Sequence, residues 1–129
     1  MTDEERPYLL QSDTYKITPP DMDDLSIYIT IANLEDKPRE IFINSKHMNS
    51  FQWISYMTRS ISARLQRGED TKQIIKELKD TYDTGGGYII PKSRGKKANS
   101  VVGHIGIVLE EHCKVLATRN HPEPTSASQ

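Results

Sequence analysis

The sequence contains a single cysteine, Cys113, among its 129 residues. One cysteine excludes an internal disulfide, and it makes the cytoplasm the expected location. No apolar run approaches the roughly 20 residues that a membrane-spanning helix needs, and the acidic start, Met1-Thr-Asp-Glu-Glu5, does not resemble a signal peptide. We therefore expect neither a membrane protein nor a secreted one.

The net charge is small, at −1, but the charges are unevenly distributed along the chain. Residues 1–24 contain seven acidic residues against Arg6 and Lys16, whereas residues 85–109 contain basic residues and no acidic one. A hydrophobic content of 35% and a charged content of 27% are typical of one small globular domain. The segregation of charge makes the basic segment a candidate binding surface.

Two segments alternate between apolar and polar residues, as half-buried strands do. The first, 25–33, places three isoleucines on one face, and the second, 39–44, places two. Residues 34–38 between them have the length and composition of a hairpin loop, with Pro38 outside the ladder. The sequence therefore predicts an antiparallel hairpin.

Three helices are predicted from apolar residues that recur at steps of three and four. The first is capped by Asn49 or Ser50 and ends at Gly68, the second is capped by Thr71, and the third is capped by Asn99 or Ser100 and continues to about residue 116. Between the second and third helices, the glycines 85–87 break the helix, and residues 88–90 are predicted to form a short third strand. Gly103 and Gly106 are costly inside a helix, at about 1 kcal/mol each, and they indicate close backbone packing or a first turn that must approach a ligand.

Together these elements predict an α+β fold: a small antiparallel sheet of two or three strands, covered by the first and longest helix, with two further helices. We expect one domain over residues 25–117, an irregular acidic lead-in over 1–24, and a disordered tail over 118–129. An unpaired sheet edge and exposed aromatic residues make a homodimer one expected state.

The sequence offers no catalytic constellation and no metal site. His104 and His112 are two turns apart on similar faces of the third helix, about 12 Å along its axis, which is too far for two ligands of one ion. His112 is expected near the helix C-terminus, where a partial positive charge is favoured. Cys113 has no base beside it and is expected to be a small, partly buried residue. We expect no cofactor.

The main candidate site is the glycine-rich, basic segment 85–100. It ends at a helix N-terminus, so it combines free backbone N–H groups, a helix dipole and cations, which are the parts of an anion or partner site. It is not a Walker A loop, because the Gly-Lys-Ser/Thr order is absent. A solvated loop with a tight turn explains the same residues equally simply. The residues predicted to bind an anion or a partner are Gly85, Gly86, Gly87, Tyr88, Lys92, Arg94, Lys96, Lys97 and Ser100.

A second candidate is the aromatic group Phe51, Trp53 and Tyr56 at the start of the first helix. Stacking on nucleic-acid bases would require these rings to be exposed on one surface beside cations. At helical spacing, such residues are more often contacts with the core or with a partner.

The order of these elements resembles the TSCPD domain, which occurs at the C-terminal side of adenosylcobalamin-dependent (class II) ribonucleotide reductases and as small separate proteins. The matching residues lie between about 25 and 113, and the most specific are Gly85-Gly-Gly-Tyr88 and Ser100-Val-Val-Gly-His-Ile-Gly-Ile-Val-Leu-Glu-Glu-His112. The Ser/Cys-Pro motif that names the domain is missing after the second helix, where the chain reads Leu78-Lys-Asp-Thr-Tyr-Asp-Thr-Gly85. The cysteine pair with which such reductases regenerate their dithiol is missing too.

The resemblance implies a non-catalytic accessory or regulatory domain that docks on a ribonucleotide reductase large chain, in deoxyribonucleotide synthesis. Any catalytic role would arise only by association with a ribonucleoside-diphosphate reductase. The alternative is a small nucleic-acid or nucleotide-phosphate binder that uses the basic segment. Four phosphate contacts would give a slope of log K against log salt of about −3 to −4, which separates the two hypotheses.

Overall fold

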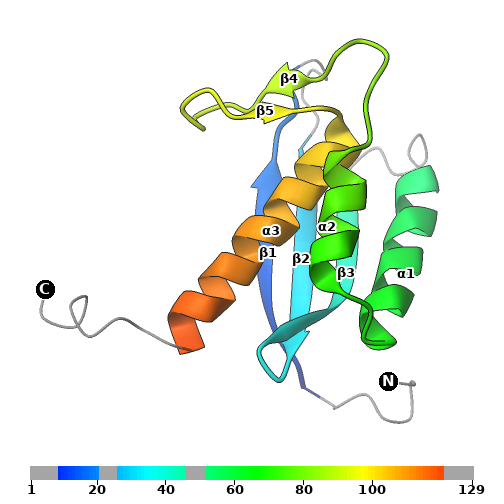
Figure 1. The fold of residues 1–129 in the computed structure, drawn as a ribbon, viewed down its shortest axis with the longest axis vertical. Helices are drawn as coiled ribbons and strands as arrows, with labels where there is room; N and C mark the ends of the chain where they lie inside the picture. Colours follow the sequence, from blue (N-terminus) through cyan, green and yellow to red (C-terminus); the bar gives the residue numbers. More distant parts are fainter. Residues whose placement is uncertain (1–8, 21–25, 46–51, 121–129) are drawn as a thin grey trace, which may run out of the picture.

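The computed structural model describes residues 9–20, 26–45 and 52–120, and all structural statements below concern these residues. The elements follow the order β1-β2-β3-α1-α2-β4-β5-α3 (Figure 1). Three strands form an antiparallel sheet, two short strands form a separate hairpin, and three helices pack beside and across the sheet. The predicted α+β class is confirmed.

The main sheet has the order β1 (Gln11–Ile17), β2 (Ile27–Leu34), β3 (Lys37–Ser45), with both pairs antiparallel. One face carries the buried isoleucines of the predicted alternation. The opposite face carries Tyr28 and Phe42, which are 41% and 53% exposed. The sheet therefore has one packed face and one face that bears exposed aromatic rings.

The prediction of an irregular lead-in over residues 1–24 is wrong for residues 11–17, which form β1 and pair with β2 from Gln11–Asn33 to Ile17–Ile27. The strand was not predicted because the acidic residues and prolines around it in the sequence are typical of irregular segments. Within it, Asp13, Tyr15 and Ile17 alternate with exposed polar residues, and these three point toward the packed face. Because only Ile17 is fully apolar, the alternation is weak in the sequence.

The β2–β3 connection is tighter than the predicted five-residue loop. Leu34 pairs with Lys37, so Glu35 and Asp36 alone form the turn, and both have positive φ values, 54° and 65°. Two consecutive residues in the left-handed region are the signature of a type I′ turn, whose twist matches that of the flanking strands. Pro38 lies inside β3, next to a bulge at Ala32–Asn33.

Helix α1 (Gln52–Gln66) runs along the β3 edge of the sheet. Ser62 binds this edge directly: its hydroxyl accepts from the Ile41 N–H at 2.9 Å and donates to the Ile41 carbonyl at 3.1 Å. One side chain thus satisfies the backbone groups that another strand would have paired. The helix ends as predicted near Gly68, whose φ is 79°. The predicted caps, Asn49 and Ser50, lie outside the described residues.

Helix α2 (Thr71–Lys79) begins at the residue predicted to be its N-cap, so its cap lies one residue earlier than predicted. Asp70, not Thr71, is the N-cap, and its carboxylate accepts from the Lys72 N–H at 3.0 Å. An aspartate at this position also interacts favourably with the helix dipole. Buried Ile74, Ile75 and Leu78 form the inner face of this helix.

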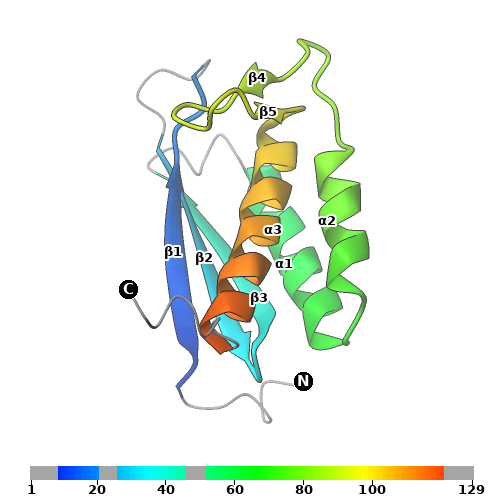
Figure 2. The same cartoon turned by 60° about the vertical axis from the view of Figure 1, so that its left-hand side comes forward.

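Helix α3 (Val101–Asn120) crosses the packed face of the sheet (Figures 1 and 2), and its N-terminal half is buried. All residues from 103 to 109 are buried, because the sheet lies on one side of the helix and α2 on the other. The sheet is covered by more than the first helix: α3 crosses its packed face, and α1 packs along β3 and adds Ile54 and Ile61 to the core. Helix α3 also includes residues 118–120 of the predicted tail, and residues 121–129 lie outside the described part.

The two glycines of α3 face α2, which confirms the predicted close packing of backbone on backbone. A Cβ atom on Gly106 would lie 2.7 Å from Leu78 Cβ and 3.1 Å from the Lys79 nitrogen. A Cβ atom on Gly103 would lie 3.6 Å from the Leu78 carbonyl oxygen. The glycine-bearing side of the N-terminal turns of α3 is therefore a packing surface for α2.

Strands β4 (Tyr88–Ile89) and β5 (Lys97–Ala98) form a small antiparallel hairpin of their own. The third strand predicted at 88–90 thus forms at 88–89 but pairs with β5 and does not join the main sheet. The hairpin lies across the N-terminal end of α3 (Figures 1 and 2).

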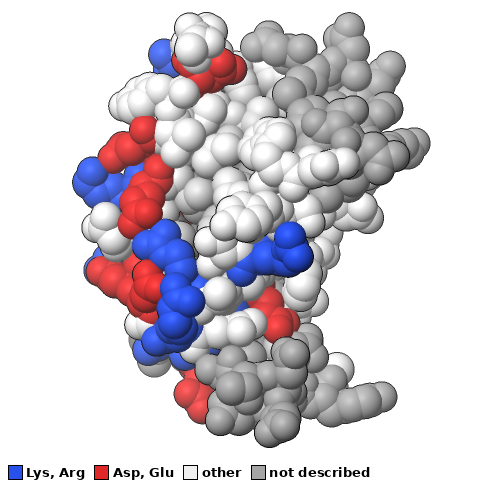
Figure 3. Space-filling view, turned by 90° about the vertical axis from the view of Figure 1, so that its right-hand side faces the viewer, with Lys and Arg blue, Asp and Glu red and all other residues white. Residues whose placement is uncertain are grey.

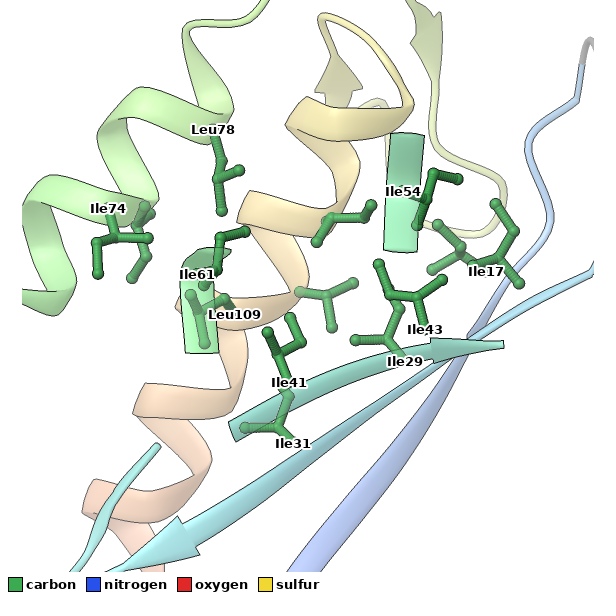
Figure 4. Packing of buried hydrophobic residues seen from close by; sticks show 14 of the residues in the cluster. Ile17, Ile29, Ile31, Ile41, Ile43, Ile54, Ile61, Ile74, Leu78 and Leu109 are labelled. Atoms are coloured by element: carbon green, nitrogen blue, oxygen red, sulfur yellow. The ribbon is translucent and has the colours of Figure 1, made fainter. Parts of the chain in front are cut away.

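The core lies between the packed face of the sheet and the three helices. Isoleucines from the sheet meet Ile54, Ile61, Ile74 and Leu109 from the helices (Figure 4). These side chains are nearly all aliphatic, and each one buried contributes about 1.5–3 kcal/mol relative to exposure. A bilayer-spanning helix is absent from the described part of the chain.

Candidate functional site

The basic hairpin, which we define as residues 88–98, is an ordered structure held by its own hydrogen bonds. The Ile90 N–H donates to the Lys96 carbonyl at 2.8 Å. The side chain of Ser93 adds further hydrogen bonds within the loop. The Ser93 hydroxyl donates to the Ile90 carbonyl at 2.6 Å and accepts from the Lys96 N–H at 3.0 Å. The predicted cationic segment is therefore presented in a defined conformation.

Three of the four predicted cations of this hairpin are exposed. Lys92 and Arg94 have positive φ values, 60° and 61°, which for residues with a side chain is a strained conformation. Lys97 lies on β5 and is also exposed, whereas Lys96 is half-buried and its ammonium group pairs with the Glu111 carboxylate at 3.0 Å. The structure thus brings together Lys92, Arg94 and Lys97 as cations with no ion pair among the described residues.

The predicted glycines have different roles from one another. Gly85 and Gly86 are exposed in the turn before β4, where the Gly85 N–H donates to the Asp83 carboxylate at 3.1 Å. Gly87 is required by a close approach, because a Cβ atom there would lie 2.1 Å from the Ala98 carbonyl oxygen. This glycine lets the β4 strand pass against the start of α3.

Ser100 caps α3 and is already fully engaged. Its hydroxyl accepts from the Gly103 N–H at 2.9 Å and donates to the Thr81 carbonyl at 2.6 Å, and the residue is buried. Asn99 next to it donates to the Lys79 carbonyl at 2.8 Å. The helix N-terminus therefore binds the end of α2, and the exposed part of the predicted site consists of Gly85, Gly86 and the exposed cations of the basic hairpin.

Tyr88 pairs with a buried histidine. Its hydroxyl lies 2.6 Å from Nδ1 of His104, which is 5% exposed. Burial lowers the pKa of His104 to about 4, because an imidazolium would lose its hydration there. His104 is thus a neutral residue that anchors the hairpin to α3, and Tyr88 has a structural role besides any binding role.

His112 occupies a second buried site of the same kind. Its Nε2 donates to Asn33 Oδ1 at 2.7 Å, and its Nδ1 accepts from the Tyr15 hydroxyl at 2.7 Å. Burial lowers the pKa of His112, although the Asp13 carboxylate, 3.9 Å away, opposes this. The expectation of a partly charged histidine at a helix end is wrong, because α3 continues beyond it and covers β1 and β2.

Cys113 lies half-buried on α3, and burial raises the pKa of its thiol. A protonated thiol is a weak nucleophile and a poor metal ligand. Among residues 9–20, 26–45 and 52–120, no three histidine, cysteine or carboxylate side chains are placed to hold a metal ion. The described part of the chain thus presents neither an activated thiol nor a metal cluster.

The aromatic residues at the start of α1 lie at the surface: Trp53 is 46% exposed and Tyr56 70% exposed. Phe51 lies outside the described residues. These exposures are larger than those expected of core contacts. Base stacking and contact with a partner therefore remain as interpretations of Trp53 and Tyr56. On the side of the molecule shown in Figure 3, basic and acidic side chains are interspersed and neither sign dominates.

A network of ion pairs crosses the α1–α2 turn. Arg64 donates from Nε to Glu69 at 2.8 Å and from its two terminal nitrogens to Glu77 at 3.0 Å each. Arg67 adds a second contact to Glu69, at 2.8 Å. This network links the two helices, and its charges are paired within the fold, unlike those of Lys92, Arg94 and Lys97, which make no ion pair among the described residues.

The fold and the hairpin define a small α+β domain with an exposed basic edge and no assembled catalytic group in its described part. The TSCPD domain matches residues 6–113, and the chain belongs to this family, whose domain is found in proteins related to ribonucleotide reductase. Neither a curated protein nor a solved structure matched the chain in the same comparisons.

Proposed function

We propose that this chain is a non-catalytic accessory or regulatory domain that docks on the large chain of an adenosylcobalamin-dependent ribonucleotide reductase. The observation that carries the proposal is the membership of the TSCPD family over residues 6–113, because this domain is found in reductase-related proteins. The role in docking fits a chain with one cysteine, since dithiol regeneration requires two.

The docking surface in this proposal is the basic hairpin together with the residues that flank it. Ile89 is 54% exposed and pairs with Lys97 across the hairpin, and Tyr82, which precedes the hairpin in the chain, is 71% exposed. An exposed tyrosine, an isoleucine and an arginine are typical of a protein-binding surface. An acidic surface of the large chain would be the complementary partner. We leave the glycine-bearing face at the start of α3 out of the proposed surface, because it packs on α2.

The second candidate function is the binding of nucleic acid or of a nucleotide phosphate through the same cations. It is favoured by the unpaired charges of Lys92, Arg94 and Lys97. With Lys96 bound to Glu111, three phosphate contacts remain, and the slope of log K against log salt on duplex DNA would be about −3. Ile89 contributes nothing to phosphate binding, and for this reason we favour the protein partner.

The two functions are separated by affinity purification of the tagged chain from its native lysate, with and without nuclease. The test variant carries Lys92→Gln, Arg94→Gln and Lys97→Gln, and a matched variant loses three other lysines, Lys37, Lys72 and Lys114.

Docking predicts that the reductase large chain is recovered with the wild type and the matched variant, survives nuclease, and is lost with the test variant. Recovery of nucleic acid and its binders alone would refute docking and support the second function.

A further inference from the structure

A groove of about 780 Å³ lies at the opposite end of α3 from the basic hairpin. It is bounded by the β2–β3 turn, the start of α2 and the C-terminal half of α3. The volume falls within the roughly 300–1,000 Å³ of small-molecule sites. Its apolar lining comes from Pro38, Ile75, Cys113, Leu116 and Ala117.

Four cations surround this apolar lining: Lys37 and Arg39 from β3, Lys72 from α2 and Lys114 from α3. In the described part of the chain, none of the three lysines makes an ion pair, and Arg39 donates only to the Pro38 carbonyl, at 3.5 Å. They come from three elements that converge on one hollow, so their positive charges reinforce one another there.

Four carboxylates line the same groove: two are compensated by cations outside it, one caps α2, and Asp36 on the β2–β3 turn makes no ion pair within the described residues. Glu69 is bound by Arg64 and Arg67, and Glu110 is bound by Lys79 at 3.0 Å. The Asp70 carboxylate accepts a hydrogen bond from the Lys72 N–H as the N-cap of α2. The groove therefore combines an apolar lining with cations that have no intramolecular partner, and such a surface is complementary to an amphipathic anion.

We propose that this groove binds an amphipathic organic anion of small-molecule size. An apolar ring or chain would contact Ile75 and Leu116, and a phosphate or carboxylate group would contact the ammonium groups of Lys37, Lys72 and Lys114. The Lys72 N–H at the start of α2 does not contact the anion, because it already donates to the Asp70 carboxylate. This site is distinct from the basic hairpin and does not depend on docking to a reductase.

The probe is 1-naphthyl phosphate, titrated into the purified chain by calorimetry. Inorganic phosphate and the neutral 1-naphthalenemethanol report the charged and the apolar half alone, and ATP tests whether a nucleobase serves as the apolar part. We expect saturable one-to-one binding of the naphthyl phosphate, at least about tenfold tighter than either half, since both contacts must contribute.

The test variant carries Lys72→Gln and Lys114→Gln, and the matched control carries Lys16→Gln and Arg59→Gln, with the same loss of charge at exposed positions outside both the groove and the basic hairpin. A third variant, Ala117→Glu, adds a carboxylate at an exposed helical position of the groove without removing a core side chain. Binding should weaken at least about tenfold in the first and third variants and stay unchanged in the control.

Equal weakening in the control, equally tight binding of inorganic phosphate, or no saturable binding would each overturn the proposal. Because every arm uses the chain without a partner, failure here leaves the reductase docking untouched, and failure of docking leaves this site untouched. Retention of the wild-type thermal unfolding curve confirms that each variant is folded.

Discussion

The contact between α2 and α3 depends on Gly106, and Gly103, one turn earlier on the same helix, provides a matched control. Replacing Gly106 with alanine would place a Cβ atom 2.7 Å from Leu78 Cβ and 3.1 Å from the Lys79 nitrogen. Both obstacles belong to the body of α2 and not to a flexible side-chain end, so the helix must shift. Overpacking of this kind costs about 1–3 kcal/mol.

Gly103→Ala is the matched control, since it lies one turn earlier on the same face. Its Cβ atom would meet Ser100 Oγ at 3.4 Å and the Leu78 carbonyl oxygen at 3.6 Å, which are ordinary contacts. Both substitutions gain helix propensity, up to about 1 kcal/mol. We therefore expect Gly103→Ala to be neutral or stabilising, and Gly106→Ala to be less stable than it by about 1–3 kcal/mol.

The assay is urea unfolding at pH 7, followed by circular dichroism, with both variants and the wild type measured under the same conditions. A similar slope in all three proteins would show that the difference lies in the folded state. If Gly106→Ala were as stable as Gly103→Ala, the described approach of α2 to α3 would be wrong.

Lowering the pH should destabilise the protein, because the pKa of His104 is about 4 in the folded state and near 6.5 in the unfolded chain. The unfolded state binds more protons between these values, so the contribution of neutral His104 to stability is complete above pH 6.5 and falls by about 3 kcal/mol by pH 4. Urea unfolding of the wild type and of His104→Gln at both pH values measures this loss. An equal loss in the two proteins would contradict the prediction. Ser62→Ala should cost about 1–3 kcal/mol, since it leaves the Ile41 N–H and carbonyl without their partner, and Ser60→Ala on the exposed side of α1 is the control. Arg94→Gly should raise the thermal midpoint, because it relieves a left-handed conformation that costs about 1–2 kcal/mol, and a lower midpoint would show that the side chain supports the hairpin.

Periodicity alone predicted the elements with strong apolar patterns. The hairpin at 25–44 and the three helices follow from isoleucines and leucines at steps of two or of three and four, and the structure has them within a few residues. The β1 strand was missed because its inward side chains, Asp13 and Tyr15, are polar. They are accommodated on the packed face by Arg119 and His112, which lie about a hundred residues later in the chain.

The same long-range contacts limit what the sequence could say about the candidate site. The sequence identified the cations of the basic hairpin. It did not show that Lys96 is bound to Glu111 or that Ser100 is bound to Thr81. The groove was missed entirely, because its cations come from β3, α2 and α3 and are scattered in the sequence. Only the folded chain brings them together.

The central claim, docking on a reductase, is tested most directly by sedimentation velocity of the purified chain mixed with the purified large chain of the adenosylcobalamin-dependent reductase from the same cells. We predict a complex that sediments faster than the large chain alone, weakens with rising salt, and is absent with Lys92→Gln, Arg94→Gln and Lys97→Gln combined. If the wild-type chain sedimented as a separate species at every concentration of the large chain tested, the account of its function would be wrong.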